Sequence, residues 1–119
     1  QSLRVGFDRI FGEAQLAFAA GDYAASARAL ERLPAPFRAL SGPDLRFRYG
    51  LALLRSAGRD VGRMKRAGNE FEELLRHDPS YASAHPELYY FLARALDGAR
   101  RFDKAVRNMR AYAAIGAAP

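Results

Sequence analysis

The basic side chains that could hold a phosphate or an acidic partner gather in one stretch of the sequence. Arg59, Arg63 and Arg66 are spaced four and three residues apart, which places them on one face of a helix, with Lys65 close by. Such a run can bind an anion, and it can equally be the solvated face of a surface helix. Aromatic residues do not alternate with the run, as a surface that stacks bases would need. The pattern therefore favours a solvated face and disfavours nucleic acid as a partner.

The histidines and carboxylates do not form a recognisable reactive site. His77 stands at the expected end of a helix, where a cation suits the helix dipole, and His85 precedes a proline. Neither histidine has a second ligand at metal-binding spacing. Glu70, Glu72 and Glu73 have basic residues three or four positions away, so ion pairing explains them. Because no phosphate-binding loop, nucleophile motif or paired-carboxylate site occurs, we expect no metal, no cofactor and no enzymatic activity.

The length and composition fit one small domain. The chain has 119 residues and no cysteine, so a core can form without disulfides or cysteine-bound metal. Its net charge is +6, yet only Lys65 and Lys104 are lysine and the other basic residues are arginine. Arginine together with abundant alanine is typical of a GC-rich genome, so part of the basic signal reflects codon usage. We expect a soluble bacterial protein of the cytoplasm or cell envelope.

The ends of the sequence suggest a piece of a longer protein. The first residue is Gln1 rather than methionine, and no charged and then apolar leader follows it. No stretch of about 18 apolar residues occurs, so we expect no membrane-spanning helix. We expect a single domain over residues 1–119 that is a fragment or a mature chain.

Almost all of the sequence has the composition and periodicity of helices. Alanine, leucine, arginine and glutamate dominate, and glycines, prolines and aspartates interrupt them at intervals. Asp22 and Asp60 each precede a periodic segment and are expected to cap it. The short turns within each pair predict antiparallel neighbours. The expected helices are residues 2–20, 22–33, 44–57, 60–77, 86–97 and 101–115.

The second helix of each pair repeats one pattern of large and small residues. A large apolar residue opens it, a small residue follows three positions later, and large apolar residues follow at positions +7 and +10. The four positions are occupied by Tyr23, Ser26, Leu30 and Leu33, by Met64, Ala67, Phe71 and Leu74, and by Phe102, Ala105, Met109 and Tyr112. Small residues let two helices approach closely and large ones fill the space beside them. Each pair then has two apolar sides and must stack on a neighbour.

These residues resemble the tetratricopeptide repeat family. The segments 21–26 and 100–105 are similar to that family's turn into its second helix, and Phe71 through Pro79 is similar to its repeat ending. The resemblance implies an all-α fold of three antiparallel helix hairpins, stacked as a short right-handed superhelix or α-solenoid. The repeats would span residues 3–36, 43–79 and 84–116. Their spacing exceeds the family period of about 34 residues, most of all between the second and third repeats. A generic helical bundle remains the alternative.

In this family the first helix of each repeat lines a concave face on which partners bind. Carried over to this sequence, the resemblance implies a face rich in aromatic and arginine side chains, which are common anchors of protein interfaces. The implied residues are Phe11, Gln15, Phe18, Phe47, Arg48, Leu51, Leu54, Arg55, Tyr90, Phe91 and Arg94. The alternative is that several of the aromatic residues pack inside the domain.

The resemblance therefore implies a scaffold that binds a helical or extended segment of a partner protein in the concave groove. A second hypothesis is a structural module that stacks on further repeats or on another copy of the chain. It rests on an apolar stripe along the last helix, which no capping segment follows. The stripe comprises Val106, Met109, Tyr112 and Ile115. A third hypothesis, less favoured, is binding of nucleic acid or an acidic partner through the arginine-rich surface.

Overall fold

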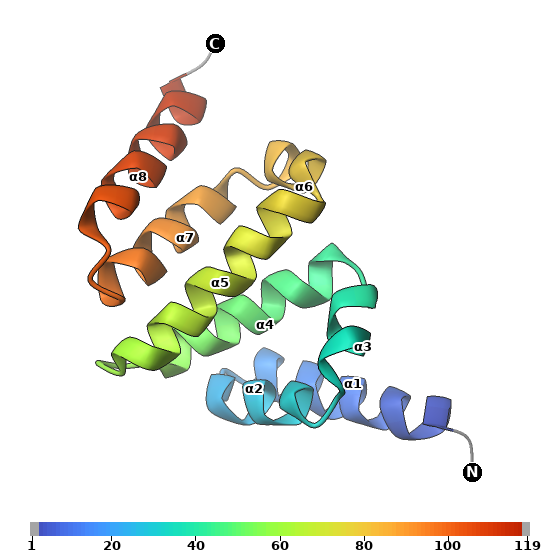
Figure 1. Cartoon of the computed structure of the whole chain (residues 1–119). Helices are drawn as coiled ribbons and strands as arrows, with labels where there is room; N and C mark the ends of the chain where they lie inside the picture. Colours follow the sequence, from blue (N-terminus) through green and yellow to red (C-terminus); the bar gives the residue numbers. More distant parts are fainter. Residues whose placement is uncertain (1–2, 118–119) are drawn as a thin grey trace.

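The structure is a computed structural model that describes the backbone of residues 3–117 and the side chains of residues 6–38 and 41–116. Within this part of the chain the regular structure is entirely helical, as the sequence predicts. The helices are α1 (Leu3–Ala19), α2 (Tyr23–Glu31), α3 (Ala35–Leu40), α4 (Pro43–Ser56), α5 (Val61–His77), α6 (Pro79–Ala84), α7 (Glu87–Gly98) and α8 (Phe102–Ala117). Figure 1 shows them following one another along the molecule, with α1 and α8 at opposite ends.

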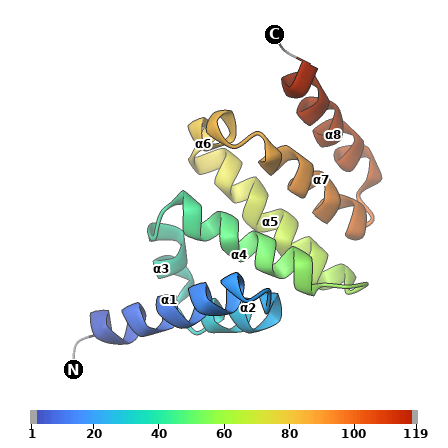
Figure 2. The ribbon, with the colours of Figure 1, turned by 180° about the vertical axis from the view of Figure 1, so that it is seen from behind.

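The six long helices form three hairpins: α1 with α2, α4 with α5, and α7 with α8. Neighbouring hairpins also pack on each other, through α2 against α4 and through α5 against α7. Figure 2 shows the same stack from behind, with α4 in front of α5. The molecule extends over 50 × 31 × 25 Å, which suits hairpins stacked in a row.

The expected starts of α2 and α5 are confirmed. The side chain of Asp22 accepts a hydrogen bond from the backbone N–H of Ala25 at 3.1 Å, and Asp60 accepts one from Arg63 at 3.1 Å. Each bond satisfies an amide that the first helical turn leaves without a partner. The expected boundaries of the six long helices lie within about three residues of those observed. The predicted start of the first helix at Ser2 lies outside the described residues.

Two short helices occupy segments that we had interpreted as breaks. Helix α3 lies between Pro34 and Pro43, and α6 follows Asp78. Each has a proline in its first turn, Pro36 in α3 and Pro79 in α6. Proline is compatible with the first turn because the amide it lacks has no partner there. The prediction of connections without helix was therefore wrong at both places.

The core follows the large-and-small pattern of the second helices. Leu30, Phe71 and Leu74 are almost completely buried, and Phe71 packs against α4 at Gly50. A Cβ atom placed on Gly50 would lie only 2.5 Å from the Phe71 ring, so glycine allows this close approach. In the first hairpin the hydroxyl of Ser26 donates to the carbonyl of Ala14 at 2.8 Å. That bond satisfies the hydroxyl of Ser26, which is 2% exposed.

Candidate protein-binding groove

Helix α4 has two exposed arginines, Arg48 and Arg55, which stand two turns and about 10 Å apart along the helix axis. Residues 49–54 between them are buried. A hollow lies beside each arginine: side chains of α1 and α2 flank Arg48, and side chains of α7 flank Arg55. We call the two hollows, taken together, the groove.

The part of the groove beside Arg48 is small. It encloses about 70 Å³ between α1, α2 and α4. Three residues predicted for the concave face, Phe11, Gln15 and Phe18, line it together with Arg48. This volume is about that of two water molecules, so this part can admit one side chain of a partner at most.

The part beside Arg55 is much larger, with a volume of about 610 Å³. The helices α2, α4, α5 and α7 and the turn between α4 and α5 contribute to it. Its lining residues are Tyr23, Leu54, Arg55, Gly58, Met64, Tyr90, Phe91 and Arg94. Five of them were predicted from the sequence, and the space is large enough for several side chains of a bound segment.

The arginines of this larger hollow lie on aromatic rings. The guanidinium carbon of Arg55 lies 5.1 Å from the centre of the Tyr23 ring and 5.7 Å from that of Phe91. Arg55 also donates a hydrogen bond to the Tyr23 hydroxyl at 3.1 Å. Arg94 lies 5.9 Å from the Tyr90 ring centre and donates to its hydroxyl at 3.0 Å. Cation–π contacts and hydrogen bonds hold both guanidinium groups in place without neutralising their charge.

The three groove arginines form no ion pair with the described carboxylates. Among the described side chains, no carboxylate lies within 4.0 Å of the guanidinium nitrogens of Arg48, Arg55 or Arg94. All three side chains are exposed. The groove is therefore an aromatic surface with a net positive charge, and its chemistry suits a ligand that carries carboxylates.

Three residues predicted for the groove belong wholly or partly to the core. Leu51 and Leu54 are buried, although Leu54 also borders the larger hollow. Phe47 packs against the rings of Phe71, Tyr81 and Phe91, with centroids 5.8 to 6.0 Å apart. Helix α4 has neighbours on three sides, so most of its apolar residues face other helices. For Phe47 and Leu51 the structure favours the alternative that we left open, packing inside the domain.

The second helices also contribute side chains to the groove that the sequence analysis did not assign to it. Tyr23 begins α2 and Met64 lies in the first turn of α5, and the sequence pattern indicated only that they fill space between helices. Both stand at a helix end, where a side chain can reach past the first helices into the groove. Tyr23 and Met64 stand close to the turns that precede their helices, at Asp22 and at Asp60 to Val61. That position is the sequence signal that could have placed them in the groove.

Intramolecular contacts account for much of the basic run on α5. Arg66 forms an ion pair with Glu31 and donates to the Tyr49 hydroxyl at 3.0 Å. The Nε of Arg63 donates to the hydroxyl of Ser56 at 2.9 Å. Two of the three arginines of this run therefore hold neighbouring helices together. This use supports the interpretation of the run as an ordinary helix surface.

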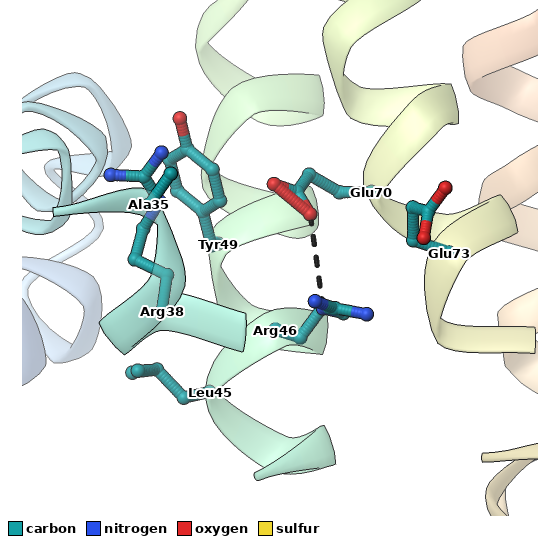
Figure 3. A pocket seen from close by; sticks show the side chains of 7 residues that line it. All are labelled: Ala35, Arg38, Leu45, Arg46, Tyr49, Glu70 and Glu73. Atoms are coloured by element: carbon teal, nitrogen blue, oxygen red, sulfur yellow. Dashed lines mark ion pairs between the residues drawn. The ribbon is translucent and has the colours of Figure 1, made fainter. Parts of the chain in front are cut away.

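A second cleft, of about 240 Å³ and with charged side chains of both signs in its lining, lies between α3, α4 and α5 (Figure 3). Arg38 crosses from α3 and donates to the carbonyl of Leu33, just beyond α2, at 2.7 Å and to that of Leu30 in the last turn of α2 at 3.3 Å. Its guanidinium lies 5.1 Å from the Tyr49 ring centre. Glu70 faces Arg46 across the cleft at 4.0 Å. Nothing in the sequence pattern indicated this cleft, because its residues come from three helices. Arg38 also lies between the expected helices 22–33 and 44–57, in a segment for which no helix was predicted.

The stability of the folded protein depends on pH through the carboxyl group of Glu70. Burial raises the pKa of its carboxyl group, and this outweighs the lowering by Arg46 and Arg38. The folded protein therefore binds this proton more tightly than the unfolded chain does. The ionised form costs stability, and the cost grows as the pH rises from the ordinary pKa of glutamate to the raised one. The cost is fully present only above the raised pKa.

Glu70→Gln should consequently raise the free energy of unfolding at pH 7 and have no such effect below roughly pH 4, where the carboxyl is protonated in both states. Urea titrations at the two pH values measure the difference. Glu73→Gln is the matched control on the same cleft. Its carboxylate pairs with Arg76 at 2.8 Å and His77 at 3.0 Å, so its removal should lower stability slightly. A loss of stability at pH 7 in Glu70→Gln would show that attraction by Arg46 outweighs burial.

The apolar stripe of α8 faces solvent. Val106, Met109, Tyr112 and Ile115, the residues predicted for self-association, are all exposed, and Phe102 is exposed beside them. Tyr112 also contacts the ring of Tyr90 with a centroid distance of 5.6 Å, so one edge of the stripe adjoins the groove. Contiguous apolar side chains on a surface are typical of interaction sites.

Comparison with protein-family models, with curated proteins and with solved structures gave no significant match. Within residues 3–117 no helix combines the length and apolar character needed to cross a membrane. The described histidines and carboxylates also include no group of three or more placed to hold a metal ion.

Proposed function

We propose that this chain is a tetratricopeptide-like interaction module that binds a helical or extended segment of a partner protein in the groove. The observation that carries the proposal is the set of exposed arginines, Arg48, Arg55 and Arg94, which have aromatic neighbours and no carboxylate partner. Rigid aromatic side chains and arginines are the residue types that contribute most to protein interfaces. The role we propose is binding, with no reaction assigned to the groove.

The arrangement of the hairpins supports the family resemblance. The first helices α1, α4 and α7 each contribute predicted residues to the groove, and the second helices α2 and α5 each pack on the first helix of the next hairpin. The right-handed superhelix and the three repeats remain part of the proposal. The expected ligand presents carboxylates to the arginines and apolar side chains to the hollow lined by Tyr90 and Phe91.

Selection of peptides tests the groove. A library of random 12-residue peptides displayed on phage is enriched on the whole chain, and binding of selected peptides is then measured by fluorescence anisotropy. We expect sequences that combine acidic with large apolar residues. The double variant Arg55→Glu/Arg94→Glu should weaken their binding by about tenfold or more, because both charges become repulsive.

The matched control is Arg9→Glu/Arg28→Glu, which makes the same change in charge at exposed arginines outside the groove. It should leave binding within about twofold, because exposed charges outside the contact are largely screened. Equal weakening by both double variants would show that net charge alone drives binding. Enrichment of peptides without acidic residues would overturn the assignment of the groove.

A further inference from the structure

The outer face of α8 is exposed at positions that are buried in the other two second helices. Positions are counted from Tyr23 in α2, Met64 in α5 and Phe102 in α8. At position +7, Leu30 in α2 is 1% exposed and Phe71 in α5 is 0% exposed, whereas Met109 in α8 is 39% exposed. At position +4, α2 has a buried alanine, α5 has the buried Gly68, and α8 has Val106 at 48% exposure. The sequence pattern of α8 is therefore that of a covered helix, but this face has no cover.

The other two hairpins show what kind of element covers this face. Helix α4 packs on α2, and α7 packs on α5. Adding a Cβ atom to Gly68 would bring it to 3.7 Å from Ala95 and 3.9 Å from Leu96, so α7 lies directly on this surface of α5. The equivalent surface of α8 suits an amphipathic helix. Because Val106 replaces the small residue, that helix would lie somewhat farther away and contact larger side chains.

The charges beside this face specify the chemistry of the partner. At position +8, Glu31 of α2 pairs with Arg66 of α5, and Glu72 of α5 lies 3.8 Å from Lys104 of α8. In both cases a glutamate on one second helix meets a cation at position +2 of the next. The residue at position +8 of α8 is Arg110, so the sign is reversed. A partner that continues the pattern must place a carboxylate opposite Arg110.

A second copy of the chain does not fit this face in the head-to-tail order of the stack. The first helices align on the small residues Ala14, Gly50 and Ala93. Two positions later stand Ala52 in α4 and Ala95 in α7, both 0% exposed, and Leu16 in α1, which is 75% exposed. The bulk of Leu16 opposes the close approach that the alanines allow. The +2 position of α2 is Ala25, which offers no charge to Arg110.

Two copies also fit poorly back to back. Packing α8 against α8 of another copy would bring the exposed side chains of Arg107 and Arg110 near the same residues of the other molecule. Like charges placed opposite each other oppose association. A helix of different sequence, with a carboxylate for Arg110, fits this face better than either arrangement of two copies.

We propose that the outer face of α8, formed by Phe102, Val106, Met109 and Arg110, binds an amphipathic helix of a partner protein with acidic side chains along the edge of its apolar stripe. This surface is separate from the arginines of the groove, so the proposal does not depend on the proposed function.

Two synthetic helical peptides provide the probe. They share one apolar stripe of leucine and alanine and differ only in their flanks, which are glutamate in one and lysine in the other. Each is titrated into the whole ¹⁵N-labelled chain, and amide shifts of α8 are followed by NMR, which detects weak binding. We expect the glutamate peptide to shift the amides of Val106, Met109 and Arg110 at submillimolar concentration. The lysine peptide should bind at least about threefold more weakly.

Three variants separate the possible outcomes. Val106→Glu/Met109→Glu should lower affinity for the glutamate peptide by about tenfold or more, while exposure of both residues keeps the fold intact. Arg110→Glu should reverse the preference between the two peptides. Arg55→Glu/Arg94→Glu, the variant that tests the groove, should leave the α8 shifts in place.

Equal binding of the two peptides, or no shift on α8 at millimolar peptide, would overturn the proposal. Sedimentation of the chain without peptide tests whether a second copy of the chain occupies the face of α8. A dimer that Val106→Glu/Met109→Glu dissociates would mean that a second copy covers α8, and this too would overturn it. A monomer at high concentration supports the proposal.

Discussion

Phe71→Ala should lower the free energy of unfolding by about 3–5 kcal/mol. The Phe71 side chain is fully buried between α5 and α4, and its ring contacts Phe47 with a centroid distance of 6.0 Å. Truncation removes its apolar burial and leaves a cavity that the surrounding helices can fill only partly. A domain of this size has a total stability of about 5–15 kcal/mol, so the variant should unfold far more easily. Denaturant titration followed by circular dichroism measures the change.

Phe102→Ala is the matched control for Phe71→Ala. Phe102 opens α8 and is 58% exposed, so the same chemical change should alter the free energy of unfolding by no more than about 0.5 kcal/mol. A similar loss in the two variants would mean that an unseen contact covers α8 in the isolated chain. It would also mean that Phe71 is not the centre of the core.

Gly50→Ala should destabilise the protein by about 1–3 kcal/mol, although alanine normally favours a helix. The new methyl group would meet the Phe71 ring at 2.5 to 3.0 Å, and neighbouring helices limit the movement of that ring. In a Phe71→Leu background the smaller side chain makes room for the methyl group. There the same substitution should be neutral or stabilising. The double-mutant cycle should thus give a coupling energy of at least about 1 kcal/mol.

Gly12→Ala separates helix propensity from packing. Gly12 lies within α1, and a Cβ atom there would meet no heavy atom within 4 Å. Alanine should raise stability by about 0.5–1 kcal/mol at this position. If Gly50→Ala gave the same gain as Gly12→Ala, then α4 and α5 could separate without cost, and the close packing at Gly50 would not be a determinant of the fold.

The long helices could be predicted because their signals are local. Asp22 and Asp60 cap helices through their own side chains, and Gly21 has a φ angle of 79°, which ends α1. Arg100 adopts a φ angle of 64° at the corresponding turn, where a glycine would have been the clearer signal. Helices α3 and α6 could not be recognised in the same way, because a proline starts one helix and ends another with no difference in the sequence itself.

The groove was harder to predict, because its residues come from helices far apart in the sequence. Helical periodicity showed that α4 has an apolar side, but it could not show that Leu51 faces the core while Arg48 and Arg55 face solvent. The cleft around Glu70 depends on Arg38, whose position follows from the path of α3. The apolar stripe on α8 was recognisable, since the same spacing of large and small residues occurs in α2 and α5.

The row of hairpins determines how the molecule folds and unfolds. Every extensive helix contact lies within a hairpin or between neighbours along the chain. Few long loops must therefore close before native contacts form, which favours rapid folding. The middle hairpin, α4 with α5, has a neighbour on both sides, whereas α1 and α8 each have one open flank. Opening should begin at the two ends and reach α4 and α5 last, so the ends can loosen and reclose while the middle stays folded.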